Sequence, residues 1–128
     1  MTQAIVRTAA GLFTLAAGLA HAQAPTPIRI LVGFPPGGGT DAIARTLAEK
    51  LKDELGAVVV VENKAGAGGA LGIGAAARAP ADGYTVLLSL SSISILPEAD
   101  KILDRKPAFT LEQFKPIARF TADPTVLV

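Results

Sequence analysis

The apolar and polar positions along the chain follow two different spacings, and the change between them marks the expected elements. Residues 28–34 (IRILVGF) form a nearly continuous apolar run, which is typical of a strand buried on both faces. After two prolines, apolar residues recur every four positions, at Ile43, Leu47, Leu51 and Leu55. This spacing predicts a helix that begins near Thr40, buries that stripe and ends at Gly56.

The middle of the chain repeats this alternation. Residues 58–62 (VVVVE) predict a second strand, which is bounded by Asn63. The glycine-dense stretch that follows is expected to form a loop that tightens into an alanine-rich helix, ending at Arg78.

A turn at residues 82–83 (DG) then leads to a third strand over residues 84–90 (YTVLLSL). From Ile95 onwards the pattern is less regular. The exception is residues 110–115 (TLEQFK), which predict a short helix with Thr110 at its cap position.

Strand, helix, strand, helix and strand with short connections indicate an α/β fold with a mostly parallel sheet flanked by helices. The last residues, 125–128 (TVLV), have the pattern of a strand that begins and is then cut off. We therefore expect the sequence to be the front part of a longer protein.

The first residues have the pattern of a secretory signal peptide. A single arginine, Arg7, precedes a small and apolar run that ends in an A-H-A site at residues 20–22. The run is shorter than the about 20 apolar residues that span a bilayer. We expect residues 1–22 to be removed, and with them His21; cleavage after Ala24 and a buried N-terminal helix are the alternatives.

The expected mature chain is electrically neutral. Without Arg7 it has eleven basic and eleven acidic residues. Balanced, scattered charges give no footprint for nucleic acid and no basic amphipathic stretch for a membrane surface. The sequence has no cysteine, so the stability of an exported form would come from an ordinary core rather than from disulfides.

Residues 33–45 (GFPPGGGTDAIAR) place a glycine-rich turn between the first strand and the first helix, where backbone N–H groups can receive an anion. A nucleoside triphosphate does not fit, because the P-loop pattern needs a lysine where Gly39 stands. A dinucleotide is an alternative, since Gly37, Gly39 and Ala42 match G-x-G-x-x-A, and Glu62 follows 20 residues later. The two intervening prolines and an exported location count against it.

A carboxylate is the third candidate anion. Gly38, Gly39 and Thr40 can offer successive N–H groups, and the Thr40 hydroxyl can add a further donor, without any lysine. Asp41 falls in the expected first turn, where it would repel a nearby ligand carboxylate, so we expect it to point aside and brace the loop. Alternatively, the glycines serve only to let strand and helix pack closely.

Three stretches of the chain together resemble the Bug-type solute receptors, the extracytoplasmic binding components of tripartite tricarboxylate transporters. The stretches are residues 27–51, 59–88 and 114–128. The resemblance implies a periplasmic-binding-protein fold, in which two α/β lobes hold a small carboxylate in the cleft between them. Residues 23–128 would then be the first lobe, truncated at its C-terminus, with the second lobe missing.

The resemblance also implies a ligand site formed by two loops. Phe34 would form a wall of this site, with Gly38, Gly39 and Thr40 as donors and Asp41 in the same loop. The loop after the third strand would line the cleft with the hydroxyls of Ser89, Ser91 and Ser92. These serines are equally suited to be caps and turn formers.

We expect a binding protein rather than an enzyme, with no cofactor and no metal. The mature sequence offers no Ser-His-Asp set, no cysteine nucleophile and no acid cluster with metal-ligand spacing. As partners, the resemblance implies a small carboxylate and the permease subunits of a tripartite tricarboxylate transporter. We expect a periplasmic monomer without direct membrane insertion. The alternatives are a dinucleotide-dependent oxidoreductase and a module that passes a ligand or signal to a membrane partner.

Overall fold

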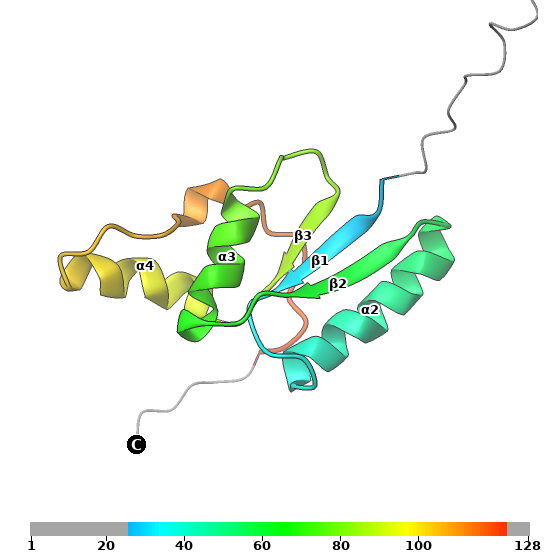
Figure 1. Cartoon of the computed structure of the whole chain (residues 1–128), viewed down its shortest axis with the longest axis horizontal. Helices are drawn as coiled ribbons and strands as arrows, with labels where there is room; N and C mark the ends of the chain where they lie inside the picture. Colours follow the sequence, from blue (N-terminus) through cyan, green and yellow to red (C-terminus); the bar gives the residue numbers. More distant parts are fainter. Residues whose placement is uncertain (1–25, 123–128) are drawn as a thin grey trace, which may run out of the picture.

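The computed structural model describes residues 26–122. The expected signal peptide (1–22) and the expected final strand (125–128) lie outside the described residues. Three strands form one sheet: β1 (Ile28–Val32), β2 (Val59–Asn63) and β3 (Thr85–Leu88). Both strand pairs are parallel and the order is β2-β1-β3 (Figure 1), so the predicted α/β fold with a parallel sheet is confirmed.

Helices lie on both sides of this sheet (Figure 1). α2 (Gly39–Leu55) contacts β1 and β2, whereas α3 (Ala70–Ala77) contacts β1 and β3. Successive side chains of a strand point to opposite faces. Ile30 therefore packs on the α2 side, Leu31 points to the other side, and both are buried. The central strand is covered on both faces, as its continuous apolar run predicted.

The buried face of α2 differs from the predicted stripe. Ala44 and Ala48 are the buried apolar residues of the helix, and their small side chains let it lie close to the sheet. Ile43 and Leu55 are 36% and 58% exposed, so the predicted stripe is wrong at both ends, although its two middle leucines do pack against the core. Residues four apart advance about 40° beyond a full turn, so three such steps rotate the stripe by about 120°.

The local signals for turns and caps are confirmed. Gly56 ends α2 in the left-handed region, with φ 59°, and its N–H donates to a carbonyl of the last helical turn. Asp82 accepts the N–H two residues further on, at 3.0 Å, and so closes the predicted turn. At the start of η3 (Leu111–Gln113), the N–H of Thr110 donates to Gln113 Oε1 at 2.7 Å.

The loop between β2 and α3 also follows the prediction. It tightens first into one turn of 3₁₀ helix, η2 (Ala67–Gly69), and then into α3, which ends at Ala77 beside the predicted end at Arg78. Ala67 adopts a φ of 49°, which is uncommon for a residue with a side chain.

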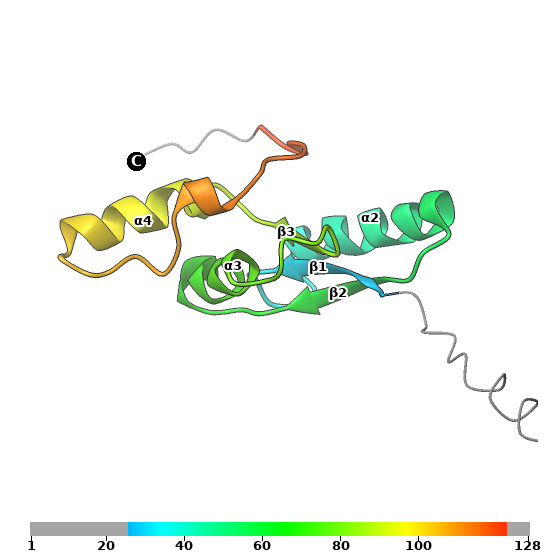
Figure 2. The same cartoon turned by 90° about the horizontal axis from the view of Figure 1, so that it is seen from above.

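The largest departure from the sequence-based expectation is α4 (Ser92–Ile102), which lies beyond α3 and away from the sheet (Figure 2). The sequence pattern is less regular from Ile95 onwards, and it did not predict this helix. Pro97 stands inside the helix, where it supplies no N–H and normally disfavours helical structure. Pro97 is buried, so packing offsets the local cost.

Candidate functional site

The two predicted site loops leave neighbouring strands at the same edge of the sheet. Val32 at the end of β1 lies opposite Leu88 at the end of β3. β1 continues into α2 through residues 33–38, and β3 continues into α4 through residues 89–91. In the order β2-β1-β3 the chain first winds to one side of β1 and then to the other. Ligands of open α/β sheets bind beside the carboxyl ends of the strands at such a switch point.

The glycines of the first loop serve different purposes. Gly37 has a φ of 86°, which side chains rarely adopt. Gly33 permits close packing, because a Cβ there would stand 2.9 Å from the carbonyl oxygen of Gly69. Among the described residues, a Cβ at Gly39 would meet no atom within 4 Å, and one at Gly38 would meet only a carbonyl oxygen at 3.8 Å. Close packing therefore explains Gly33, whereas Gly38 and Gly39 leave their backbone open to a contact from outside.

α2 begins directly behind these open glycines. Gly38 is its N-cap residue, and no side chain of the described part of the chain caps this end. The first N–H groups of a helix have no partner within the helix, and the helix dipole gives them partial positive charge. Gly39 and Thr40, the first two helical residues, therefore present donors where an anion is favoured.

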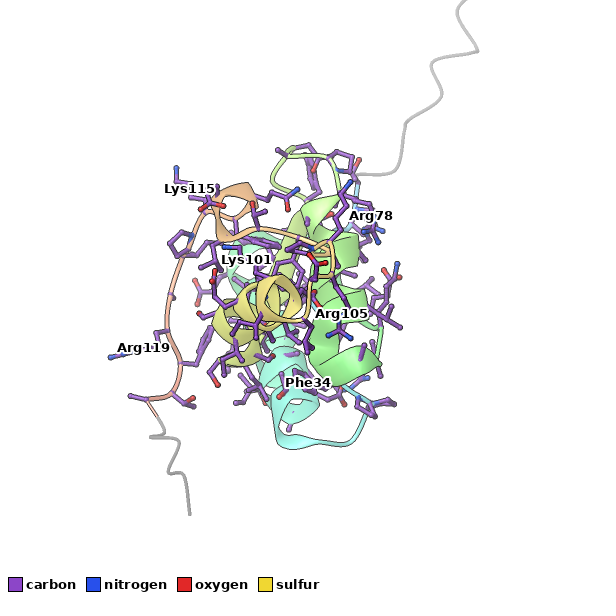
Figure 3. The ribbon with its side chains drawn as sticks, turned by 90° about the vertical axis from the view of Figure 1, so that its left-hand side faces the viewer. Phe34, Arg78, Lys101, Arg105, Lys115 and Arg119 are labelled. Carbon is purple, nitrogen blue, oxygen red and sulfur yellow. The ribbon has the colours of Figure 1, made fainter. Side chains whose placement is uncertain are left out.

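Phe34, a residue of the first loop, lies against η2. A Cβ on Gly69 would stand 3.3 Å from Phe34 Cζ, so the ring rests on that glycine. The side chain is half-buried and packs against the core cluster on the α2 side. Figure 3 shows Phe34 close to the start of α2.

Asp41 points inward and braces the loop, as the sequence suggested. The residue is 3% exposed. Its Oδ2 accepts the N–H of Gly37 at 2.9 Å and Arg45 Nε at 2.8 Å, and its Oδ1 accepts Asn63 Nδ2 at 3.0 Å. Hydrogen bonds from Arg45, then from Gly37 and Asn63, hold the pKa of this carboxyl well below its usual range. The structure thus separates Asp41 from the open donors of the same loop.

Asn63 is a site residue that the sequence reasoning identified only as the end of a strand. Its Nδ2 donates to the carbonyl of Phe34 at 3.1 Å as well as to Asp41. Its Oδ1 accepts Arg45 Nη2 at 3.3 Å. A polar side chain at the carboxyl end of a strand, beside a glycine loop, was the signal that could have revealed this role.

Three serines follow the end of β3. Ser89 and Ser91 lie in the second loop, whereas Ser92, which was expected in the same loop, is the first residue of α4. Ser89 is half-buried, and its hydroxyl lies 3.4 Å from the carbonyl of Leu90. Ser91 is exposed and precedes α4 without capping it by its side chain. The Oγ of Ser92 is buried and has no hydrogen-bond partner among the described residues, which is costly for a hydroxyl unless an outside group satisfies it.

Glu62, the acidic residue that a dinucleotide would require, already forms ion pairs with two cationic side chains. Glu62 lies 3.1 Å from Lys64 Nζ and 3.6 Å from an Arg29 guanidinium nitrogen. Arg29 also donates to Thr85 Oγ1 at 3.1 Å, which ties this cluster to β3. A ribose hydroxyl would have to compete with both cations for Glu62.

A metal centre and a membrane-spanning helix are two further possibilities within residues 26–122. No group of three or more His, Cys, Asp or Glu side chains is placed there to hold a metal ion. None of the helices in that range combines the length and the apolar character needed to cross a membrane.

Residues 43–128, which make up most of the chain, match a protein family described as the tripartite tricarboxylate transporter family receptor. The chain belongs to this receptor family. Among curated relatives, this chain is similar to Protein BugT of Bordetella pertussis, with 46% identity over 123 residues that cover 92% of the chain and 37% of the relative. A UPF0065 protein from the tcbD-tcbE intergenic region of Pseudomonas sp. is 39% identical, over 80% of the chain and 30% of its own length.

Solved structures agree with this family. The periplasmic binding protein BugD matches with a TM-score of 0.53 and 49% identity, covering 56% of this chain and 24% of BugD. A structure described as a periplasmic transporter matches with a TM-score of 0.57 and 40% identity, covering 70% of this chain and 29% of its own. The chain thus has part of the fold of a periplasmic binding protein and spans about a third of the length of the curated relatives.

Proposed function

We propose that this chain forms part of an extracytoplasmic receptor that captures a small carboxylate. The observation that carries the proposal is the open N-terminus of α2 at the switch point of the sheet. The N–H groups of Gly38, Gly39 and Thr40 and the Thr40 hydroxyl would donate to the carboxylate. Phe34 would form one wall of the site.

The second loop supports the same site. A carboxylate oxygen, or a water that bridges to one, would satisfy the buried hydroxyl of Ser92. Ser89 and Ser91 would add hydroxyl groups from the loop that precedes α4. Arg45 offsets the negative charge of Asp41, so the dipole of α2 and the loop donors would dominate the field that an anion meets.

The ligand would then pass to the permease subunits of a tripartite tricarboxylate transporter. Family membership and the likeness to the periplasmic binding protein BugD support this role. In this proposal the chain acts in the periplasm as a monomeric binding protein without enzymatic activity, after removal of residues 1–22. Further donors would come from the part of the curated relatives that this chain does not span.

A thermal-shift screen, followed by calorimetry, tests the proposal. The samples are this chain and a chimera in which it is continued by the remaining part of Protein BugT. Citrate, succinate, glutamate and benzoate represent the carboxylates, and NAD and NADP represent the dinucleotides. We expect at least one carboxylate, and neither dinucleotide, to raise the melting temperature of the chimera. A response to a dinucleotide alone would replace the receptor with the oxidoreductase alternative.

A further inference from the structure

We propose that Asn63, Asp41 and Arg45 form a positioning unit, which holds the first loop in the shape in which it meets an anion. The ligand in this inference rests on the proposed function, whereas the geometry of the unit stands on its own. None of the three side chains needs to touch the ligand. Their role is to fix the backbone that does.

The unit holds the loop at two points. The amide of Asn63, at the end of β2, donates to the Phe34 carbonyl where the loop leaves the sheet. The carboxylate of Asp41, in the first turn of α2, accepts the N–H of Gly37 just before the open glycines. The hydrogen bond between Asn63 and Asp41 joins these two points, although 22 residues separate the two side chains along the chain. Gly38 and Gly39, whose backbone is open to contact from outside, lie beyond these two hydrogen-bonded points.

Arg45 keeps the charge of the unit compatible with an anion. It approaches Asp41 at 2.8 Å and Asn63 at 3.3 Å, so one guanidinium contacts both of the other members. Among the described residues, Arg45 is the charged group that contacts Asp41, and the other two donors, Gly37 and Asn63, are neutral. Without Arg45, a nearly buried carboxylate would lie uncompensated beside the anion site and would repel the ligand.

The geometry also separates positioning from binding within the first turn of α2. Both oxygens of Asp41 are occupied by donors from the protein, whereas the neighbouring N–H groups of Gly39 and Thr40 begin an uncapped helix. Asp41 therefore acts on the ligand only through the loop. This assignment makes Asp41 a positioning residue of the first loop rather than a ligand contact.

Nuclear magnetic resonance of the chain tests the unit without any ligand. The variants are Asn63→Ala and Arg45→Ala, with Lys52→Ala on the exposed part of the same helix as the control. We expect amide exchange at Gly37 to become about tenfold faster in both test variants, while the amides of Ile30 and Val32 keep their protection. Unchanged exchange at Gly37 in both variants overturns the proposal.

The titration of the Asp41 carboxyl carbon provides a readout that a purely structural role of Arg45 would not move. In Arg45→Ala we expect this titration to shift to higher pH, and in Arg45→Lys to return partly, because lysine keeps the charge but lacks the planar fork that also reaches Asn63. An unmoved titration overturns the charge-compensating role. Arg45 is exposed, so these variants remain decisive if Asn63→Ala fails to fold.

Calorimetry with citrate then links the unit to binding, using the chimera with Protein BugT. We expect the citrate affinity to fall about tenfold or more in Asn63→Ala and Arg45→Ala, and to stay unchanged in Lys52→Ala. Equal affinities in all variants overturn the positioning role. If the parent chimera binds none of the carboxylates, the proposed function fails, and the exchange and titration measurements still decide whether the unit shapes the loop.

Discussion

Gly72 of α3 lies directly against Gly33 at the end of β1. A Cβ built on Gly72 would stand 2.6 Å from the Cα of Gly33 and 3.0 Å from its nitrogen. The contact joins two backbones, so no side chain can rotate away to relieve a clash. Because Gly33 also opens the first loop, the approach of α3 and the geometry of the candidate site depend on the same pair of glycines.

We expect Gly72→Ala to destabilise the fold by about 2 kcal/mol, within the usual cost of overpacking, as measured by urea unfolding. Helix propensity alone would favour alanine by about 1 kcal/mol, so a loss of stability isolates the backbone contact. The control is Gly39→Ala, where a Cβ has open space and the change should stay within about 0.5 kcal/mol. A Gly72→Ala variant as stable as the parent would show that α3 can move away from β1 at little cost.

The lowered pKa of Asp41 makes stability depend on acid. The hydrogen bonds from Arg45, Gly37 and Asn63 favour the ionised form of the Asp41 carboxyl in the folded state. In the unfolded chain an aspartate has a pKa of about 3.9. The contribution is therefore complete above that value and is lost as the pH falls towards the lower pKa of the folded state.

We expect Asp41→Asn to be less stable than the parent at pH 7 and to lose less further stability on acidification. Chemical unfolding at a series of pH values between 2 and 7 measures both effects. Asp53→Asn, on the exposed C-terminal part of the same helix, is the matched control and should keep the slope of the parent. Parallel curves for Asp41→Asn and the parent would contradict the prediction.

The choice between a carboxylate and a dinucleotide can be decided with two substitutions in the chimera. Gly39→Val should lower carboxylate affinity by about tenfold or more, because the added side chain fills the open space in front of the loop backbone. Gly39 does not have a positive φ, so the backbone tolerates valine and the fold should persist. Glu62→Gln should leave carboxylate affinity unchanged. Loss of nicotinamide dinucleotide binding in Glu62→Gln would favour a dinucleotide over a carboxylate as the ligand of the first loop.

The chain of 128 residues should bind carboxylates only weakly by itself. Its open donors face water, and each hydrogen bond made there nets only about 1 kcal/mol. Enclosure between two lobes would exclude water and surround the anion with donors from both sides. Calorimetry that compares the chain with the chimera checks this expectation, and comparable micromolar affinities for both would show that this chain alone is sufficient.

The mature protein should begin at Gln23. Small alanines at positions 20 and 22 fit the cleavage pattern of a signal peptidase. The intact mass of the protein exported by a bacterial host measures the cleavage site. A retained N-terminus would contradict the periplasmic assignment and would favour the dinucleotide alternative.

The sequence predicted those parts of the fold that depend on neighbours along the chain. The apolar runs of β1 and β2, the glycine stop at Gly56 and the cap at Thr110 are local signals, and the structure confirms each of them. The helix around Pro97 was missed because the local preference of proline opposes a helix that packing stabilises. Tertiary context decided that element.

The candidate site divides in the same way. The glycine loop could be found because a strand, a run of glycines and a helix are consecutive in sequence. The hydrogen bond between Asp41 and Asn63 could not be predicted from the sequence, since it joins the start of α2 to the end of β2. The buried hydroxyl of Ser92 was suggested as a site group only by the resemblance, and its lack of a partner among the described residues can be seen only in the folded structure.

The hydrogen bond between Asn63 and Asp41 also means that the first loop loses its conformational entropy during folding and not during ligand binding. Backbone freedom in residues 34–37 is lost during folding, when the Phe34 carbonyl and the Gly37 N–H acquire their partners. An anion that docks on Gly38 and Gly39 therefore meets a surface that is already rigid. Its association should therefore involve little conformational entropy loss from this loop.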